Sequence, residues 1–196
     1  KLRLQKMTDH SRCIWLPNDK PDYTQYHDTE WGIPVQDDVT LFEMLILEGA
    51  QAGLNWYTIL KRRNAYRLAF KQFDPEYCAH LTDRELENIL TRHHVIRHRL
   101  KVFSVRQNAQ IFLAIQRKYG SFQAYLWNFI AGKPIINRPQ HLTDIPASTP
   151  LSTQISKDFK QYGMHFVGPT IIYAYMQAIG MVNDHMTCCY LCPESP

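Results

Sequence analysis

Glu48 stands out in this sequence because a carboxylate ends an apolar helical stripe. A leucine, a methionine and a second leucine precede Glu48 by seven, four and three residues, so the four side chains share one helix face. Burying a carboxylate on such a face is costly unless it has a hydrogen-bond partner, a cationic ligand or partial exposure at a cleft. Glu48 is therefore either a structural carboxylate bonded to backbone or arginine, or the recognition group of a binding site.

Aromatic residues could build a binding site around this carboxylate. Trp56 follows Glu48 by eight residues, after the small-residue turn GAQAGLN, and could line the same cleft. Tyr26, Trp31 and Trp15 lie in an N-terminal stretch that we expect to be rich in loops. Aromatic side chains in such stretches often cover a core. The alternative is a stacking box, in which ring faces hold a planar base and a carboxylate accepts its N–H groups or offsets its positive charge.

Cysteine and histidine residues near both chain ends could bind a metal ion. The chain has five cysteines, an odd number that cannot all form intrachain disulfides, and this favours a reducing compartment. His185 and Cys189 are four residues apart, one helical turn, and could point at one ion. Cys13 and His27 would complete the tetrahedral set of a structural zinc site. The cysteine spacing does not match the regular four-cysteine run of an iron–sulfur cluster.

Basic residues are unevenly distributed along the chain. The formal net charge is only +4, yet residues 88–143 contain nine Lys or Arg and no Asp or Glu. The densest part is RHHVIRHRLK, residues 92–101, in which four basic residues alternate with three histidines. This composition is typical of a surface that faces phosphates, and equally of a solvated basic helix face.

Helical periodicity and capping residues account for most of the chain. They predict helices over residues 38–48, 55–70, 82–90, 96–119, 151–162 and 169–179, with a short one from 75. No strand alternation is evident, and the segment 131–150, rich in proline and polar residues, is the one major connector. The last two helices flank a hairpin, MHFVGPT, and Pro169 suits a first helical turn whose N–H groups could meet a DNA phosphate. Most helix pairs of this kind are only packing units.

Length and composition favour one folded domain over residues 1–196. Hydrophobic residues make up 45% of the chain and charged residues 20%, and 196 residues can bury a core without disulfides. No apolar run reaches the ~18 residues of a membrane span, and the N-terminus lacks the pattern of a secretory signal. We therefore expect a cytoplasmic protein without membrane contact, associated with the nucleoid if it is bacterial.

Five segments together resemble the 3-methyladenine DNA glycosylase I family of the helix-hairpin-helix superfamily. They are YHDTEWG (26–32), LFEMLILEGAQAGLNW (41–56), IRHRLK (96–101), FVGPTIIYAYMQAIGMVNDH (166–185) and the CC that follows. Their order and spacing are family-like over nearly the whole chain. The resemblance implies an all-α fold of two lobes with a DNA-facing cleft, a helix-hairpin-helix unit over about 151–180, and a structural zinc ion that joins the termini.

The resemblance also implies a role for each candidate residue. It places one zinc ion on Cys13, His27, His185 and Cys189. It makes Glu48 the carboxylate that recognises the base. Trp56 would stack on the flipped base, Tyr26 would hydrogen-bond it, and Trp31 and Trp15 would form the pocket wall. We expect DNA-backbone contacts from Arg97, Arg99, Gly168 and Thr170. Asp184 lies about where the superfamily carries a catalytic aspartate, although orienting His185 or capping would suit it equally.

The implied activity is hydrolytic excision of 3-methyladenine from alkylated double-stranded DNA by a monomer. The N3-methylated base is cationic in DNA and already a good leaving group, so flipping and recognition would supply most of the catalysis. Free 3-methyladenine would be the product, and no lysine nucleophile is evident, so the abasic strand would stay intact. One alternative is a non-catalytic, zinc-stabilised DNA-binding module. A zinc hydrolase is disfavoured because catalytic zinc normally keeps an open coordination position.

Overall fold

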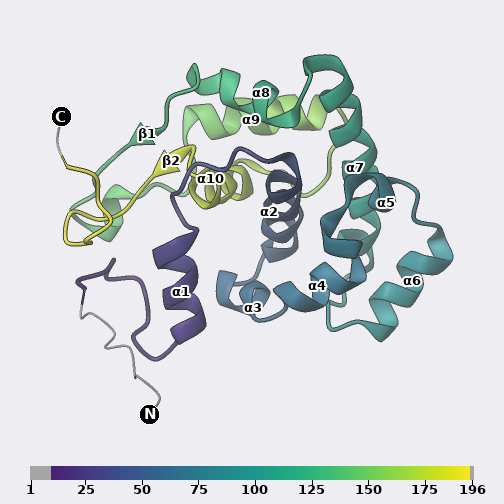
Figure 1. Ribbon diagram of the computed structural model, residues 1–196, viewed down its shortest axis with the longest axis horizontal. Coiled ribbons are helices and arrows are strands. Elements are labelled where there is room, and N and C mark those ends of the chain that lie inside the picture. The colour runs from purple at the N-terminus through teal and green to yellow at the C-terminus, as the bar shows by residue number, and fades with distance from the viewer. Residues whose placement is uncertain (1–9, 195–196) are drawn as a thin grey trace, which may run out of the picture.

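The computed structural model describes residues 10–194, and helices dominate this part of the chain (Figure 1). The α-helices are α1 (Pro21–Thr29), α2 (Asp38–Gln51), α3 (Trp56–Leu60), α4 (Arg63–Ala69), α5 (Pro75–Ala79), α6 (Asp83–Arg92), α7 (Arg99–Tyr119), α8 (Phe122–Trp127), α9 (Pro150–Gln161) and α10 (Pro169–Ala178). Short 3₁₀ turns cover Lys71–Phe73, Asn128–Ile130 and Leu142–Asp144. Two strands of two residues each, β1 (Ile135–Ile136) and β2 (Val182–Asn183), complete the described elements.

Several predicted helix ends are confirmed by their capping contacts. The Asp37 carboxylate accepts from the Thr40 N–H at 2.8 Å and starts α2. Thr82 and Glu85 form the predicted capping box of α6, because the Glu85 carboxylate accepts from the Thr82 N–H at 2.7 Å and the Thr82 hydroxyl accepts in return. Gly120 follows α7 with a φ of +87°, a conformation that glycine adopts without strain.

Two other boundaries differ from the prediction. The predicted helix over 55–70 is two helices, α3 and α4, and the Arg62 guanidinium donates to the Thr58 carbonyl at 2.9 Å where they meet. The long helix begins at Arg99 instead of Ile96, where the Tyr66 hydroxyl accepts the Ile96 N–H at 3.1 Å and keeps residues 93–98 outside the helix.

Two helices lie where none was expected. α1 falls in the stretch predicted to be rich in loops, and it buries only Tyr26 and His27, so its sequence carries little amphipathic signal. α8 is capped partly from a distance: the Asp38 carboxylate, at the start of α2, accepts from the N–H groups of Phe122 and Gln123, each at 2.8 Å. Such a long-range cap leaves no local pattern in the sequence.

Helices α2 and α10 lie side by side in the middle of the molecule (Figure 1). Residues 41–50 of α2 are buried without interruption, so this helix is the centre of the core. α10 also packs against α9, and α7 packs against α5, α6 and α8. No helix in the described part of the chain is long and apolar enough to cross a membrane.

The connector and the first and last described segments of the chain meet on the opposite side of the molecule from α6 (Figure 1). β1, within the connector, pairs in parallel with β2 in a register that sets Ile135 opposite Val182. Near the ends, the Tyr190 N–H donates to the Ser11 carbonyl at 2.9 Å, and the Ser11 hydroxyl donates to the Cys188 carbonyl at 2.6 Å. The connector is therefore fastened to the C-terminal segment, and that segment to the N-terminal one.

Candidate functional site

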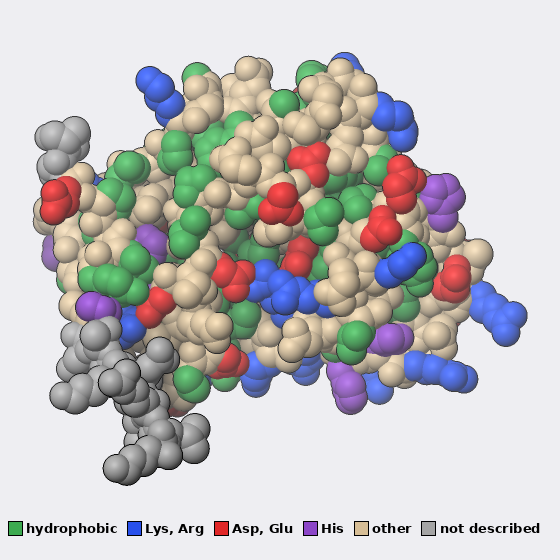
Figure 2. Space-filling view, viewed as in Figure 1, with side chains coloured by type: hydrophobic (Ala, Val, Ile, Leu, Met, Phe, Trp, Pro, Cys, Tyr) green, Lys and Arg blue, Asp and Glu red, His purple; other side chains and the backbone are tan. Residues whose placement is uncertain are grey.

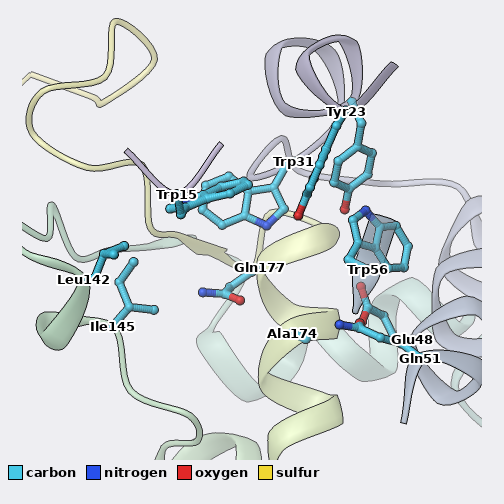
Figure 3. A pocket seen from close by; sticks show the side chains of 11 residues that line it. Trp15, Tyr23, Trp31, Glu48, Gln51, Trp56, Leu142, Ile145, Ala174 and Gln177 are labelled. Atoms are coloured by element: carbon cyan, nitrogen blue, oxygen red, sulfur yellow. The ribbon is translucent and has the colours of Figure 1, made fainter. Parts of the chain in front are cut away.

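A cavity of about 330 Å³ lies where α1, the α2–α3 junction, α10 and the connector meet (Figure 3). It is lined by Trp15, Tyr23, Tyr26, Trp31, Glu48, Gln51, Trp56, Leu142, Ile145, Ala174 and Gln177. Figure 3 shows Glu48 and Trp56 on one side, Trp15, Leu142 and Ile145 on the other, and Gln177 between them. The structure thus brings all five predicted pocket residues into one cavity, Trp15, Tyr26, Trp31, Glu48 and Trp56.

Glu48 is a buried carboxylate with an unsatisfied oxygen. Glu48 is 3% exposed, and its Oε2 has no hydrogen-bond partner within the described residues. Burial raises the pKa of Glu48 from 4.5 to about 8, because a low-dielectric surrounding disfavours the charged form. The structural alternative, a carboxylate tied to backbone or arginine, therefore finds no support at Oε2.

Aromatic rings surround this carboxylate. Trp56 is buried, and its Nε1–H likewise has no acceptor within the described residues. The Tyr26 ring centroid lies 5.2 Å from that of Trp56, and Trp15 and Trp31 meet edge to face at 4.9 Å. Burial, reinforced by the nearby Glu48, raises the pKa of Tyr26 well above its ordinary value, so its hydroxyl stays protonated. The cavity therefore combines ring faces with donors and an acceptor.

The turn between α2 and α3 is held by a buried lysine. The Lys101 ammonium donates to the carbonyls of Ala50 at 2.9 Å and Ala52 at 2.6 Å, and burial lowers the pKa of this lysine. Asn55 then caps α3, since its side chain accepts from the Thr58 N–H at 2.9 Å. These contacts fix the spacing between the helix end that carries Glu48 and the helix start that carries Trp56.

Six lining residues were not predicted from the sequence, and they are Tyr23, Gln51, Leu142, Ile145, Ala174 and Gln177. Ala174 and Gln177 are three apart on α10 and share a helix face, which is a signal that could have been read. Leu142 and Ile145 lie in the connector, which the β1–β2 pairing and the Asn137–Asp184 hydrogen bond fasten to the segment after α10. The connector is therefore part of the site.

The hairpin between α9 and α10 is fastened to α7 and to α2. The Asn108 side chain brackets His165, donating to its carbonyl at 3.0 Å and accepting from its N–H at 2.9 Å. Phe166, at a φ of +57°, lies against Gly49, where a Cβ atom would come within 3.3 Å of Phe166 Cβ and of its carbonyl oxygen. Gly49 follows Glu48 directly, so its missing side chain lets the hairpin approach the helix that carries the carboxylate.

The N-terminus of α10 is open. Gly168 precedes the helix without a side-chain cap, a Cβ atom there would meet nothing within 4 Å, and Thr170 is exposed. The N–H groups of a first helical turn have no partners inside the helix and attract anions. This end of α10 could therefore accept a phosphate.

The basic turn before α7 lies beside the hairpin, where the His98 and Phe166 rings meet edge to face at 5.9 Å. Arg97 is exposed and forms no ion pair within the described residues. Arg99 Nε donates to Glu87 at 2.7 Å, and its guanidinium covers the Phe103 ring at 3.9 Å. Figure 2 shows basic and acidic side chains interspersed around α6, and Glu87 of α6 offsets the charge of Arg99.

Cys13, His27 and Cys189 form a buried cluster in which one ligand atom of each residue lies within 4.8 Å of the others. Cys189 Sγ is 3.7 Å from His27 Nε2. A hydrogen bond from Cys13 outweighs burial and lowers the pKa of Cys189 well below its ordinary value. A thiolate between a second thiol and an imidazole is a donor set that suits zinc.

His185 adjoins this cluster with an orphaned nitrogen. Its ring centroid is 5.0 Å from that of His27, and the buried Nε2 has no partner within the described residues. Burial lowers the pKa of His185, which keeps the imidazole neutral and able to bind a metal. The opposite nitrogens are oriented by neighbours, His185 Nδ1 by Asn183 Oδ1 at 3.0 Å and His27 Nδ1 by Asp28 Oδ1 at 2.8 Å.

Asp184 is not among the residues that line the cavity. It is 1% exposed and accepts hydrogen bonds from Asn137, Tyr173 and Gln177. The carboxylate oxygens are thus engaged with protein donors, which disfavours a role as a catalytic base. It is Asn183, and not Asp184, that contacts the His185 ring.

A second buried carboxylate on α2 belongs to an ion-pair network. Glu43 Oε1 accepts from Arg63 Nε at 2.5 Å and from Arg67 Nε at 2.9 Å. Arg63 also donates to Glu30 Oε2 at 2.6 Å, so the network joins the end of α1 to α2 and α4.

Comparisons with known proteins agree with this architecture. A family model described as methyladenine glycosylase matches residues 15–192. DNA-3-methyladenine glycosylase 1 of Escherichia coli is 43% identical over 181 residues, which cover 91% of this chain and 96% of that protein. A crystal structure of 3-methyladenine DNA glycosylase I has a TM-score of 0.90 at 45% identity and covers 93% of this chain and 100% of its own.

A variant of 3-methyladenine DNA glycosylase I, crystallised in complex with 3-methyladenine, has a TM-score of 0.87 at 37% identity. That match covers 91% of this chain and 96% of the other. Sequence and fold agree over nearly the whole length, and the chain therefore belongs to the methyladenine glycosylase family.

Proposed function

We propose that this chain excises 3-methyladenine from double-stranded DNA and leaves an abasic site without cutting the strand. One observation carries the proposal: a buried carboxylate with a free oxygen, Glu48, faces a cavity walled by aromatic rings. A relative in the same family was crystallised with 3-methyladenine, and a curated relative is named for this activity. A flipped purine lesion fits such a cavity chemically, because it offers ring faces for stacking and N–H groups for hydrogen bonds.

Recognition would depend on the protonation state of Glu48, which burial and a cationic ligand shift in opposite directions. Without a ligand, burial holds the pKa of Glu48 at about 8 and favours the neutral form. A cationic base would favour the carboxylate by direct attraction and would satisfy Oε2. Trp56 would stack on the base, the Tyr26 hydroxyl would hydrogen-bond it, and Trp31 and Trp15 would form the walls. Undamaged adenine is neutral at N3 and would gain less from the same groups.

Catalysis would require little proton transfer, because the methylated base in DNA already leaves as a neutral molecule. The residues of the cavity would hold the base outside the stack, where its bond to the sugar can break. Their carboxylate and ring faces would favour positive charge at the reacting centre, and water would then capture the sugar cation. The described cavity lining contains no lysine that could attack the sugar, which agrees with a monofunctional enzyme.

DNA would be held by the helix-hairpin-helix unit of α9 and α10. The free N–H groups after Gly168 and the Thr170 side chain would contact a phosphate, and Arg97 and Arg99 would contact phosphates from the adjoining turn. Because Gly49 seats Phe166 of the hairpin beside Glu48, a phosphate held at the hairpin would lie in a fixed relation to the cavity. We propose that one monomer performs these steps.

The donor set at the chain ends fits one structural zinc ion held by Cys13, His27, His185 and Cys189. The three clustered ligand atoms and the orphaned His185 Nε2 support this assignment. Bound zinc would cross-link the N-terminal and C-terminal segments. With four protein ligands it would have no free coordination position for a substrate or water.

The zinc assignment is tested by metal analysis of cysteine variants. One zinc per chain is expected in the wild type, and Cys13→Ser or Cys189→Ser should lose it together with thermal stability. Cys188→Ser, at an exposed site, and Cys192→Ser, at a partly exposed one, are the matched controls and should retain it. A wild type without stoichiometric metal, or equal loss in all four variants, would refute the assignment.

The activity is tested by incubating the protein with methylated duplex DNA and identifying the released base by chromatography. Release of 3-methyladenine, with strand breaks only after alkali treatment, is expected. DNA binding without base release would instead support a non-catalytic DNA-binding module. Release accompanied by direct strand cleavage would contradict the monofunctional mechanism.

A further inference from the structure

Gln177 and Asp184 form a pair that joins the cavity wall to the buried C-terminal segment. Gln177 lies on α10 and lines the cavity, and its Nε2 donates to Asp184 Oδ2 at 2.7 Å. Asp184 follows β2 and is 1% exposed. One member of the pair therefore meets the cavity, and the other lies in the core behind it.

Three side chains donate to the Asp184 carboxylate. Oδ1 accepts from Asn137 Nδ2 at 2.7 Å, and Oδ2 accepts from the Tyr173 hydroxyl at 2.6 Å as well as from Gln177. A carboxylate only accepts hydrogen bonds, so Gln177 must turn its NH₂ group, and not its oxygen, toward Asp184. The chemistry of the partner thus fixes the orientation of the amide.

With its nitrogen fixed, Gln177 presents its oxygen to the cavity. Figure 3 shows the amide oxygen on the side of Ala174 and Glu48 and the nitrogen turned away from them. Within the described part of the chain, no donor bonds to Oε1. The amide dipole therefore has its negative end toward the cavity, and the Asp184 charge behind it strengthens that polarity.

We propose that Gln177 contacts the flipped base through Oε1 and that Asp184 is the positioning residue that holds this oxygen in place. The inference rests on the proposed function. A cationic aminopurine offers N–H donors and positive charge, and acceptor oxygens suit both. Glu48 supplies such an oxygen from α2, and Gln177 supplies a second from α10. The connector takes part through Asn137, which shares the Asp184 carboxylate.

The test compares Gln177→Met, which keeps the length of the side chain but removes the amide, with Asp184→Asn. In Asp184→Asn the new NH₂ group lets the Gln177 amide turn over and present its own NH₂ group to the base. Each variant should lose about tenfold in affinity for free 3-methyladenine and in single-turnover excision rate. Affinity for undamaged duplex DNA should not change, because the proposal assigns the phosphate contacts to other residues.

Tyr173→Phe is the matched control because it removes another donor to the same Asp184 oxygen and leaves Gln177 in place. It should lower the melting temperature yet change base affinity less than about twofold, well below a lost hydrogen bond. A purely structural role for Asp184 predicts that base affinity falls in step with melting temperature in all three variants. That result would overturn the proposal.

A double-mutant cycle provides the decisive comparison. The Gln177→Met/Asp184→Asn double variant should be no weaker in base affinity than Gln177→Met alone, since Asp184 acts through Gln177. Asp184 adjoins His185, so the metal content of each variant is measured as well. If Asp184→Asn has lost its metal, the result for Gln177→Met alone tests the proposal. If the wild type excises the base and Gln177→Met has the same base affinity and excision rate, this inference alone is overturned. If the wild type releases no base, the proposed function is overturned.

Discussion

Glu43 and Glu48 stand five residues apart on the same helix and are buried almost equally, at 6% and 3% exposed. Their surroundings are opposite. Glu43 Oε1 accepts from two arginines of α4, whereas Glu48 Oε2 meets no donor in the described part of the chain. Arg63 and Arg67 are one helical turn apart and converge on the first carboxylate. Aromatic rings and an open cavity face the second.

The contrast separates a structural carboxylate from a functional one. A paired buried charge holds helices together, and removing its partner is what costs stability. An unpaired buried carboxylate is kept neutral at the expense of stability, and a cationic ligand can relieve that cost. Burial alone would have ranked the two residues as equivalent, so the hydrogen-bond partners carry the information about function.

Glu43→Gln should produce the largest change in stability. The substitution leaves the buried Arg63 with only the more exposed Glu30 as a carboxylate partner, and the expected loss is about 3–5 kcal/mol in the free energy of unfolding. Chemical denaturation with fluorescence detection measures this loss. Excision per folded molecule, assayed well below the melting temperature, should be little changed. A variant as stable as the wild type would show that the ion pairs of Glu43 contribute no net stability.

Glu48→Gln should act in the opposite direction on stability and strongly on activity. Because the folded-state pKa is raised from 4.5 to about 8, the native state keeps a proton that the unfolded state releases, and Glu48 costs stability above pH 4.5. The variant should therefore gain up to about 3 kcal/mol in unfolding free energy at pH 7. Excision should fall roughly ten- to hundredfold through loss of a charge-assisted hydrogen bond.

Two measurements can contradict that expectation separately. If denaturation shows a less stable Glu48→Gln protein at pH 7, the carboxylate has a partner that the structure does not reveal. If the correctly folded variant turns over normally, Glu48 has no part in base recognition. The stability gain should also shrink as the pH is lowered toward 4.5, where the wild-type carboxylate is protonated in both folded and unfolded chains.

The pH dependence of kcat/KM should report the same residue. Recognition of a cationic base requires the carboxylate, so kcat/KM should fall by up to about tenfold per pH unit below the Glu48 pKa of about 8. Glu48→Gln should remove this limb and give a flat profile at its lower rate. A wild-type profile that is level from pH 6 to 9 would show that the ionisation of Glu48 does not limit recognition.

Sequence patterns predicted the parts of the molecule that local chemistry determines. Caps such as Asp37 and the Thr82–Glu85 box located helix ends, and the stripe that ends at Glu48 located the carboxylate. The helix at Phe122 and the pocket wall at Leu142 depend on partners distant in the chain. The sequence also did not show that Glu43 is paired, because its partners are two arginines of another helix.

The smallest expected effect concerns a paired and an unpaired charge on the protein surface. Arg99 is paired with Glu87 and lies over Phe103, whereas Arg97, two residues earlier in the same turn, has no ion pair in residues 10–194. Arg97→Ala should lower the slope of log affinity for duplex DNA against log salt by about 0.9, the value for one phosphate contact. Arg99→Ala should lower it less, because Glu87 already offsets that charge. Both variants should bind methylated and undamaged duplexes more weakly to the same extent, since phosphates carry no information about the lesion.

Salt titrations of DNA binding by the two variants test this prediction. An unchanged slope in both would make the turn an ordinary solvated basic face, and a larger change in Arg99→Ala would mean that DNA displaces Glu87 from its arginine.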